Sequence, residues 1–124
     1  MRDTNWNIMV SYAFSSDSIM LTDMDGGSVD KTTYRGETNT ITFKPSAGVR
    51  TVDSLTITSP NPLPAGVSIS QVTSNRNLIV TDMDSLASDA SAVEVVYCLH
   101  FTDSNGNKVD SDPKLINMPT LRPT

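Results

Sequence analysis

The residues of this chain best suited to chemistry are aspartates that occur twice in the same setting. The segments IMLTDMD (19–25) and LIVTDMD (78–84) each end an apolar run with Thr-Asp-Met-Asp. Carboxylate oxygens on flexible loops are ligands that Ca²⁺ prefers. Asp30 and Asp89 follow the two segments and could complete such a site. The pattern therefore identifies four candidate calcium ligands: Asp23, Asp25, Asp82 and Asp84.

The spacing excludes one kind of calcium site and leaves another open. An EF-hand loop that began at Asp23 would need Gly at its sixth position and Glu at its twelfth, where this chain has Ser28 and Tyr34. If every connection between strands reverses direction, however, both Thr-Asp-Met-Asp segments reach the same end of the fold. Two Asp-x-Asp loops would then converge, as they do in C2-like calcium modules. The alternative is ordinary turn chemistry, because aspartate readily ends a strand before Gly or Ser.

The alternation of side chains along a strand predicts which way these residues point. Met24 and Met83 should share a face with Met20 and Ile79, while the aspartates point to the opposite face. The identity between the two segments does not extend far along the chain. Two strands that end alike therefore explain the repeat better than an internal duplication.

A catalytic site is not indicated. Nucleophilic catalysis needs a nucleophile, a base within hydrogen-bond reach and a group that orients the base. The chain has one cysteine, Cys98, and one histidine, His100, which lie on the same face of an apolar strand. A small packed thiol and a half-buried imidazole explain both residues. We therefore expect a non-enzymatic protein with no catalytic residue and no cofactor other than the calcium considered above.

Composition restricts the partner and the compartment. The formal net charge is −5, and the nine basic residues are scattered, which is not the pattern of a protein that binds nucleic acid. Twelve of the fourteen acidic residues are aspartate, which favours turns over helices. No apolar run approaches the ~20 residues of a membrane span, and no stretch resembles a signal peptide. The expectation is a protein without membrane insertion that is cytoplasmic by default, with export by another route left open.

Apolar and polar residues alternate along most of the chain with the period of a β-strand. The Asn105-Gly106 pair gives the strongest hairpin signal. Residues 25–37, rich in glycine and turn formers, are expected to form an irregular connection. The expected strands are 5–14, 18–24, 38–45, 49–60, 67–73, 77–83 and 92–102, followed by an edge segment through Val109. Seven or eight short strands predict a single antiparallel β-sandwich over residues 1–117, with a C-terminal tail at 118–124.

Three segments resemble bacterial domains. SAVEVVYCLHFTDSNGN (91–107) is similar to the penultimate strand and final hairpin of bacterial immunoglobulin-like domains, and RGETNTITF (35–43) is similar to the entry of one of their inner strands. SDPKLINMP (111–119) resembles the terminus of the small bacterial family called DP-EP, which has no assigned function, although Met118 stands where an acid is expected. These resemblances imply an immunoglobulin-like sandwich and leave its function open.

The function favoured by the sequence is an interaction or structural module of bacterial or phage origin. Edge strands and loops of a sandwich can bind a protein partner or a second copy of the same chain. Tyr34, beside Arg35 on the long connection, is the expected recognition residue, and a role as a loop anchor would explain it as well. Calcium binding through the Asp-x-Asp loops is the alternative function.

Overall fold

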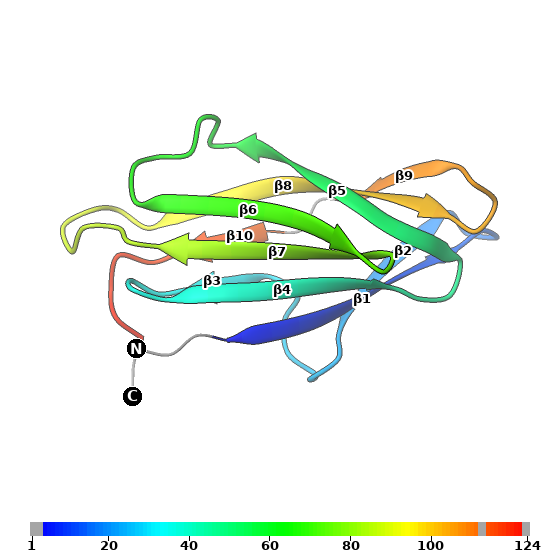
Figure 1. Cartoon of the computed structure of the whole chain (residues 1–124), viewed down its shortest axis with the longest axis horizontal. Helices are drawn as coiled ribbons and strands as arrows, with labels where there is room; N and C mark the ends of the chain where they lie inside the picture. Colours follow the sequence, from blue (N-terminus) through cyan, green and yellow to red (C-terminus); the bar gives the residue numbers. More distant parts are fainter. Residues whose placement is uncertain (1–3, 112–113, 123–124) are drawn as a thin grey trace.

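Two β-sheets packed face to face form this chain, whose computed structural model describes residues 4–111 and 114–122 (Figure 1). One sheet contains β1 (Asn5–Ala13), β2 (Ser18–Asp23), β4 (Thr38–Pro45), β6 (Val67–Ser74) and β7 (Asn77–Asp84), in the order β2-β1-β4-β7-β6. The other contains β3 (Lys31–Thr33), β5 (Val49–Ser59), β8 (Val93–Asp103), β9 (Lys108–Ser111) and β10 (Lys114–Asn117), in the order β3-β10-β8-β5 with β9 also paired to β8. The all-β class is confirmed. Within the described ranges no helix is present, and so none that could cross a membrane.

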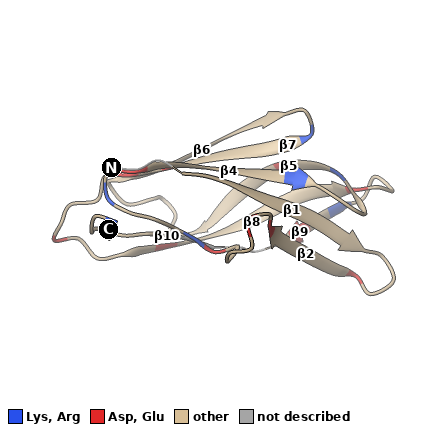
Figure 2. Ribbon diagram, turned by 90° about the horizontal axis from the view of Figure 1, so that it is seen from below, with Lys and Arg blue, Asp and Glu red and all other residues tan. Residues whose placement is uncertain are grey.

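One core fills the space between the sheets. Figure 2 shows the sandwich from its side, with β4, β6 and β7 in one layer and β8 and β10 in the other. Alternate residues of β8 are buried: Val95, Tyr97, Leu99 and Phe101. Phe43 of β4 meets Tyr97 edge-on across the interface, with ring centroids 6.2 Å apart. Each fully buried side chain of this size contributes about 1.5–3 kcal/mol of hydrophobic stabilisation.

The expectation of a purely antiparallel sandwich is wrong in two places. β1 runs parallel to β4, and β3 runs parallel to β10. The chain crosses to the second sheet after β2 and returns before β4, so β1 and β4 become neighbours without a hairpin between them. β3 also lies inside the segment 25–37 that was expected to be irregular, because three residues are too few to show an alternation.

The C-terminal segment is part of the sandwich. β10 pairs with β8 on one side and with β3 on the other, so it is an inner strand and not the continuation of an edge. Beyond it, the N–H of Met118 donates to the carbonyl of Thr33, and the N–H of Arg35 donates to the carbonyl of Thr120, each over 2.8 Å. Residues 118–122 of the expected tail are therefore held against the fold.

Candidate functional site

The two aspartate pairs lie in one sheet and at the ends of strands that run the same way, but they do not meet. β2 is antiparallel to β1, β1 is parallel to β4 and β4 is antiparallel to β7. Following the register across the sheet, Asp23 lies level with Leu78, four residues before Asp82. Three strand spacings and four residues of rise put roughly 20 Å between the two aspartates. The four candidate ligands therefore form no common site in this structure, and calcium binding stays a prediction.

Asp23 is already engaged with a cation of the chain. Its buried carboxylate forms a salt bridge with the buried ammonium of Lys31, which also lies over the ring of Trp6, 5.3 Å from the centroid. Burial alone would raise the pKa of Asp23, but the Lys31 hydrogen bond and the N–H of Asp25 outweigh it and hold this pKa below its ordinary value. The exposed Asp25 lies in an ordinary turn that follows the end of β2.

The β7 aspartates point into the sandwich. The predicted alternation is confirmed along β7, where Met83 is half exposed and Asp82 and Asp84 are buried on the opposite face. Met20 and Met24 are exposed and Asp23 is buried, which fits opposite faces as predicted, but Asp25 is exposed too. The face of β7 that carries Asp82 and Asp84 is the core side of the sheet. A layer of buried polar side chains therefore closes this end of the hydrophobic core; besides the two aspartates it contains Thr33, Glu37, Asn39 and Asn117.

Asp82 and Asn117 are the least satisfied members of this polar layer, and Asp82 is the one that can carry a charge. It is fully buried, and neither of its carboxylate oxygens has a hydrogen-bond partner within the described part of the chain. Burial raises the pKa of Asp82 to about 7, the side chains of Thr33 and Asn117 lie near enough to moderate that rise, and the charge of Asp84 adds to it. Burial also raises the pKa of Asp84, whose Oδ1 accepts the N–H of Leu86 at 3.0 Å. The layer therefore favours the protonated form of Asp82 at mildly acidic pH.

The two expected recognition residues anchor the C-terminal segment. The guanidinium of Arg122 lies 4.7 Å from the centroid of the Tyr34 ring and donates to both oxygens of the buried Glu37, at 2.5 and 2.8 Å. Arg35 contributes the backbone hydrogen bond to Thr120. Tyr34 is only partly exposed as a result. These contacts of Tyr34 and Arg35 fit the loop-anchor interpretation.

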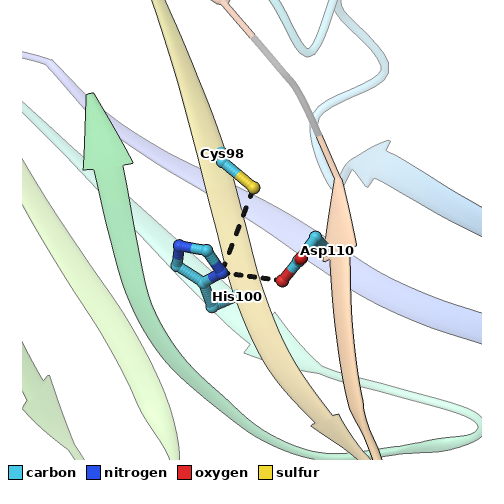
Figure 3. A group of neighbouring side chains, drawn as sticks. All are labelled: Cys98, His100 and Asp110. Atoms are coloured by element: carbon cyan, nitrogen blue, oxygen red, sulfur yellow. Dashed lines mark hydrogen bonds and ion pairs between the residues drawn. The ribbon is translucent and has the colours of Figure 1, made fainter. Parts of the chain in front are cut away.

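A second group of chemistry-bearing residues lies on the outer face of the second sheet. Cys98 and His100 of β8 point away from the core, and Asp110 of β9 lies directly opposite His100 (Figure 3). Nδ1 of His100 is 2.7 Å from Oδ1 of Asp110 and 3.9 Å from Sγ of Cys98, while its Nε2 is 2.8 Å from the hydroxyl of Thr56. Cys98 and His100 share one face of the strand, as predicted, whereas Asp110 was not among the predicted site residues.

This arrangement is not a Cys-His-Asp catalytic triad. In a triad, one ring nitrogen faces the nucleophile and the other is held by the acid. Here both Cys98 and Asp110 lie against the same nitrogen, Nδ1, and a threonine occupies Nε2. The imidazole therefore cannot accept a proton from the thiol while Asp110 holds its N–H on that side.

The sheet edges differ in how well they are protected. Leu55 on the outer edge of β5 donates its N–H to the Gln71 side chain at 2.8 Å and accepts from it at 3.0 Å, and the N–H of Val52 is bonded to the carbonyl of Arg76. β3 is only three residues long. β6 is an eight-residue edge strand, VSISQVTS, with no charged residue and no proline, and Val72 is 60 % exposed. Natural edge strands usually carry a charge, a proline or a cover at such a position.

A comparison of the sequence with models of known protein families finds no match, and a comparison with curated proteins finds none either. The immunoglobulin-like and DP-EP resemblances therefore stay predictions.

Proposed function

We propose that this chain is a non-enzymatic interaction module, an immunoglobulin-like sandwich that associates with a second copy of itself along the edge of β6. The observation that supports association most directly is the uncharged, exposed and proline-free edge of β6. Unpaired strand edges of this length pair readily with another strand. The chemistry of the edge favours a second copy, because an uncharged strand can pair with itself without bringing like charges together.

The immunoglobulin-like assignment is supported by the order of the strands. Immunoglobulin domains place their second, fifth and fourth strands side by side in one sheet and their third, sixth and seventh in the other. Taken from β4 onward, the chain has β4-β7-β6 in one sheet, and β5 and β8 with β9 and β10 in the other. The parallel pairing of β1 with β4 is a departure that any assignment to this class has to include.

Sedimentation velocity of the full chain over a range of concentrations tests the proposal. The wild-type chain should show a dimer that grows with concentration. Ser70 is an exposed position near the middle of β6. If two copies of β6 pair antiparallel about their midpoints, the lysines of Ser70→Lys lie close together, so this variant should remain monomeric. Met20→Lys, on the exposed edge strand β2, is the matched control and should still dimerise. A wild-type chain that stays monomeric at high concentration, or a dimer that only Met20→Lys disrupts, would refute pairing through β6.

A further inference from the structure

We propose that Cys98, His100 and Asp110 bind a borderline-soft divalent cation, of which Zn²⁺ is the type, on the outer face of the second sheet. Their ligand atoms all lie within 4.8 Å of one another. Thiolate, imidazole and carboxylate are together the donor set that Zn²⁺ takes in proteins. Structural zinc sites are closed by four protein ligands, whereas accessible sites have three protein ligands and a fourth position open to solvent. The three residues here match the accessible kind.

Two of the three separations between ligand atoms are close to what a tetrahedral ion needs, and the third, between the Cys98 sulfur and the Asp110 oxygen, is at most 4.8 Å. Zinc bonds of about 2.3 Å to sulfur and about 2.0 Å to nitrogen or oxygen place neighbouring ligand atoms roughly 3.3–3.6 Å apart. The Cys98 sulfur lies 3.9 Å from Nδ1 of His100, slightly beyond this range, and the Asp110 oxygen lies 2.7 Å from the same nitrogen, slightly inside it. The Asp110 side chain is 61 % exposed and can withdraw by the required fraction of an ångström. An ion between the three atoms therefore replaces the direct His–Asp hydrogen bond.

The backbone holds the ligands in place before an ion arrives. β8 is paired with β5 on one side and with β9 and β10 on the other, so both of its ligands come from an inner strand. His100 and Asp110 are opposite each other in the β8–β9 register. Ligands carried on paired strands are positioned more accurately than ligands on loops.

The hydrogen bond to Thr56 is compatible with metal binding through Nδ1 of His100, because a hydroxyl can accept a proton from Nε2. With the proton on Nε2 and donated to the Thr56 hydroxyl oxygen, Nδ1 presents its lone pair to the metal. The Cys98 thiol loses its proton to solvent on binding, and the thiolate and the Asp110 carboxylate together balance the two charges of the cation. Affinity should therefore increase with pH until the thiol is ionised.

A hydrogen-bonded cluster lies beside the proposed site on this face, two residues further along β8 from His100. Asp53, Thr102 and Lys108 form their own hydrogen-bonded cluster, in which Asp53 accepts from Thr102 at 2.6 Å and from Lys108 at 3.4 Å. These groups are satisfied without a metal. Among the residues that the structure describes, this cluster therefore neither competes for the ion as a free carboxylate nor places a lysine between the ligands.

Titration of the metal-free full chain with Co²⁺ and Zn²⁺ tests the proposal. Co²⁺ reports thiolate ligation through a sulfur-to-cobalt charge-transfer band, and Zn²⁺ should displace it at one equivalent. Cys98→Ser should abolish the band, His100→Ala and Asp110→Asn should each weaken binding at least about 10-fold, and Thr56→Val should weaken it roughly 10-fold through the second nitrogen. Asp17→Asn, in the exposed turn between β1 and β2, is the matched control and should leave binding unchanged.

Two results would overturn the inference. One is the absence of a charge-transfer band at millimolar Co²⁺ in a folded chain, with folding verified by circular dichroism. The other is a band, or a zinc affinity, that does not change in Cys98→Ser and Asp110→Asn. Because the readout is metal binding and not association, its failure is distinguishable from failure of the β6 dimer.

Discussion

The ionisation of Asp82 should make this protein less stable at neutral pH than at mildly acidic pH, and Asp82→Asn should remove that loss. Asp82 is fully buried, and its pKa of about 7 lies well above the ordinary 3.8 because burial disfavours the carboxylate. Asparagine has nearly the same shape and stays neutral at every pH. The substitution therefore removes the charge while leaving the packing of this end of the core in place.

The sign follows from proton binding. Between about pH 4 and pH 7 the folded chain keeps the Asp82 proton, while an unfolded aspartate has already lost it. The unfolded state binds fewer protons in this window, so the free energy of unfolding falls as pH rises through it and then levels off. One pH unit of difference corresponds to about 1.4 kcal/mol, so full ionisation costs up to about 4 kcal/mol.

The assay is urea unfolding of wild type and Asp82→Asn between pH 4.5 and 8.5. The two chains should have similar stability at the acidic limit, and the variant should be more stable by up to about 4 kcal/mol at the alkaline limit, or roughly 10–15 °C in melting temperature. The comparison between the two chains cancels the opposite contributions of Asp23 and Glu37, whose pKa values are lowered and whose stabilisation is lost only near and below pH 4.

The reasoning would be refuted by parallel pH profiles for the two chains. It would equally be refuted if the carboxyl carbon of Asp82, followed by NMR, titrated near pH 4. A variant less stable than wild type at all pH values would show that the carboxylate is favourably bonded, and that burial does not dominate.

Three further measurements test other contacts. Gly48→Ala should lower the free energy of unfolding by more than about 2 kcal/mol, because a Cβ there would meet the Tyr12 carbonyl oxygen at 2.0 Å and φ is +79°. Gly106→Ala is its control, since φ is +88° but a Cβ there would meet only a guanidinium nitrogen of Arg50, at an ordinary contact distance of 3.8 Å. It should cost about 1 kcal/mol by urea unfolding, and equal losses would contradict the clash. Arg122→Ala should lower the free energy of unfolding by about 2 kcal/mol or more, because it leaves the buried Glu37 without its charged partner. Arg122→Lys should lower it by less, and a loss below about 0.5 kcal/mol for Arg122→Ala would contradict this reasoning. The melting temperature should be the same in millimolar calcium as in EGTA, because the two aspartate pairs do not converge. A melting temperature several degrees higher in calcium would support the calcium alternative.

The long strands were predictable because their pattern is strong. Alternation over five large residues of β8 defines a buried face by itself: four of these side chains are in the core, and the fifth, Val93, is partly buried against it. β3 and β10 were not predictable, because Lys31–Thr33 and Lys114–Asn117 are too short to show a period and their pairing depends on segments distant in sequence. Parallel neighbours are set by such long-range pairing, which no local pattern contains.

The position of the β7 aspartates was half predictable. Alternation placed them opposite Met83, as observed. Alternation does not say which face of β7 packs against the core. The general rule that charged residues lie outside would put the aspartate face in solvent, which is wrong here. The apolar residues on the same face as the aspartates, Leu78 and Val80, carry the correct signal, because both are fully buried. A strand whose pattern continues into aspartate therefore brings those carboxylates into the core with it.

The Asn105-Gly106 hairpin shows how much depends on a single residue of register. The pair predicts a two-residue turn, in which both residues would have positive φ. Only Gly106 does, at +88°, and the loop has one more residue, so that Asp103 faces Asn107 and its N–H donates to the Asn107 carbonyl. The Asp103 carboxylate holds this loop by accepting the N–H groups of Asn105 and Asn107, both at 2.9 Å.

That one residue creates the His100–Asp110 pair. A two-residue turn would have placed Ser111 opposite His100 and turned Asp110 toward the core, since a shift of one residue exchanges the faces of a strand. The observed register instead sets Val109 opposite Phe101, where it packs against the core. Burying valine in place of aspartate is favourable by several kcal/mol, so the core selects the longer loop. The signal for the proposed metal site was therefore in the sequence, in the apolar residue beside Asp110 and not in the turn.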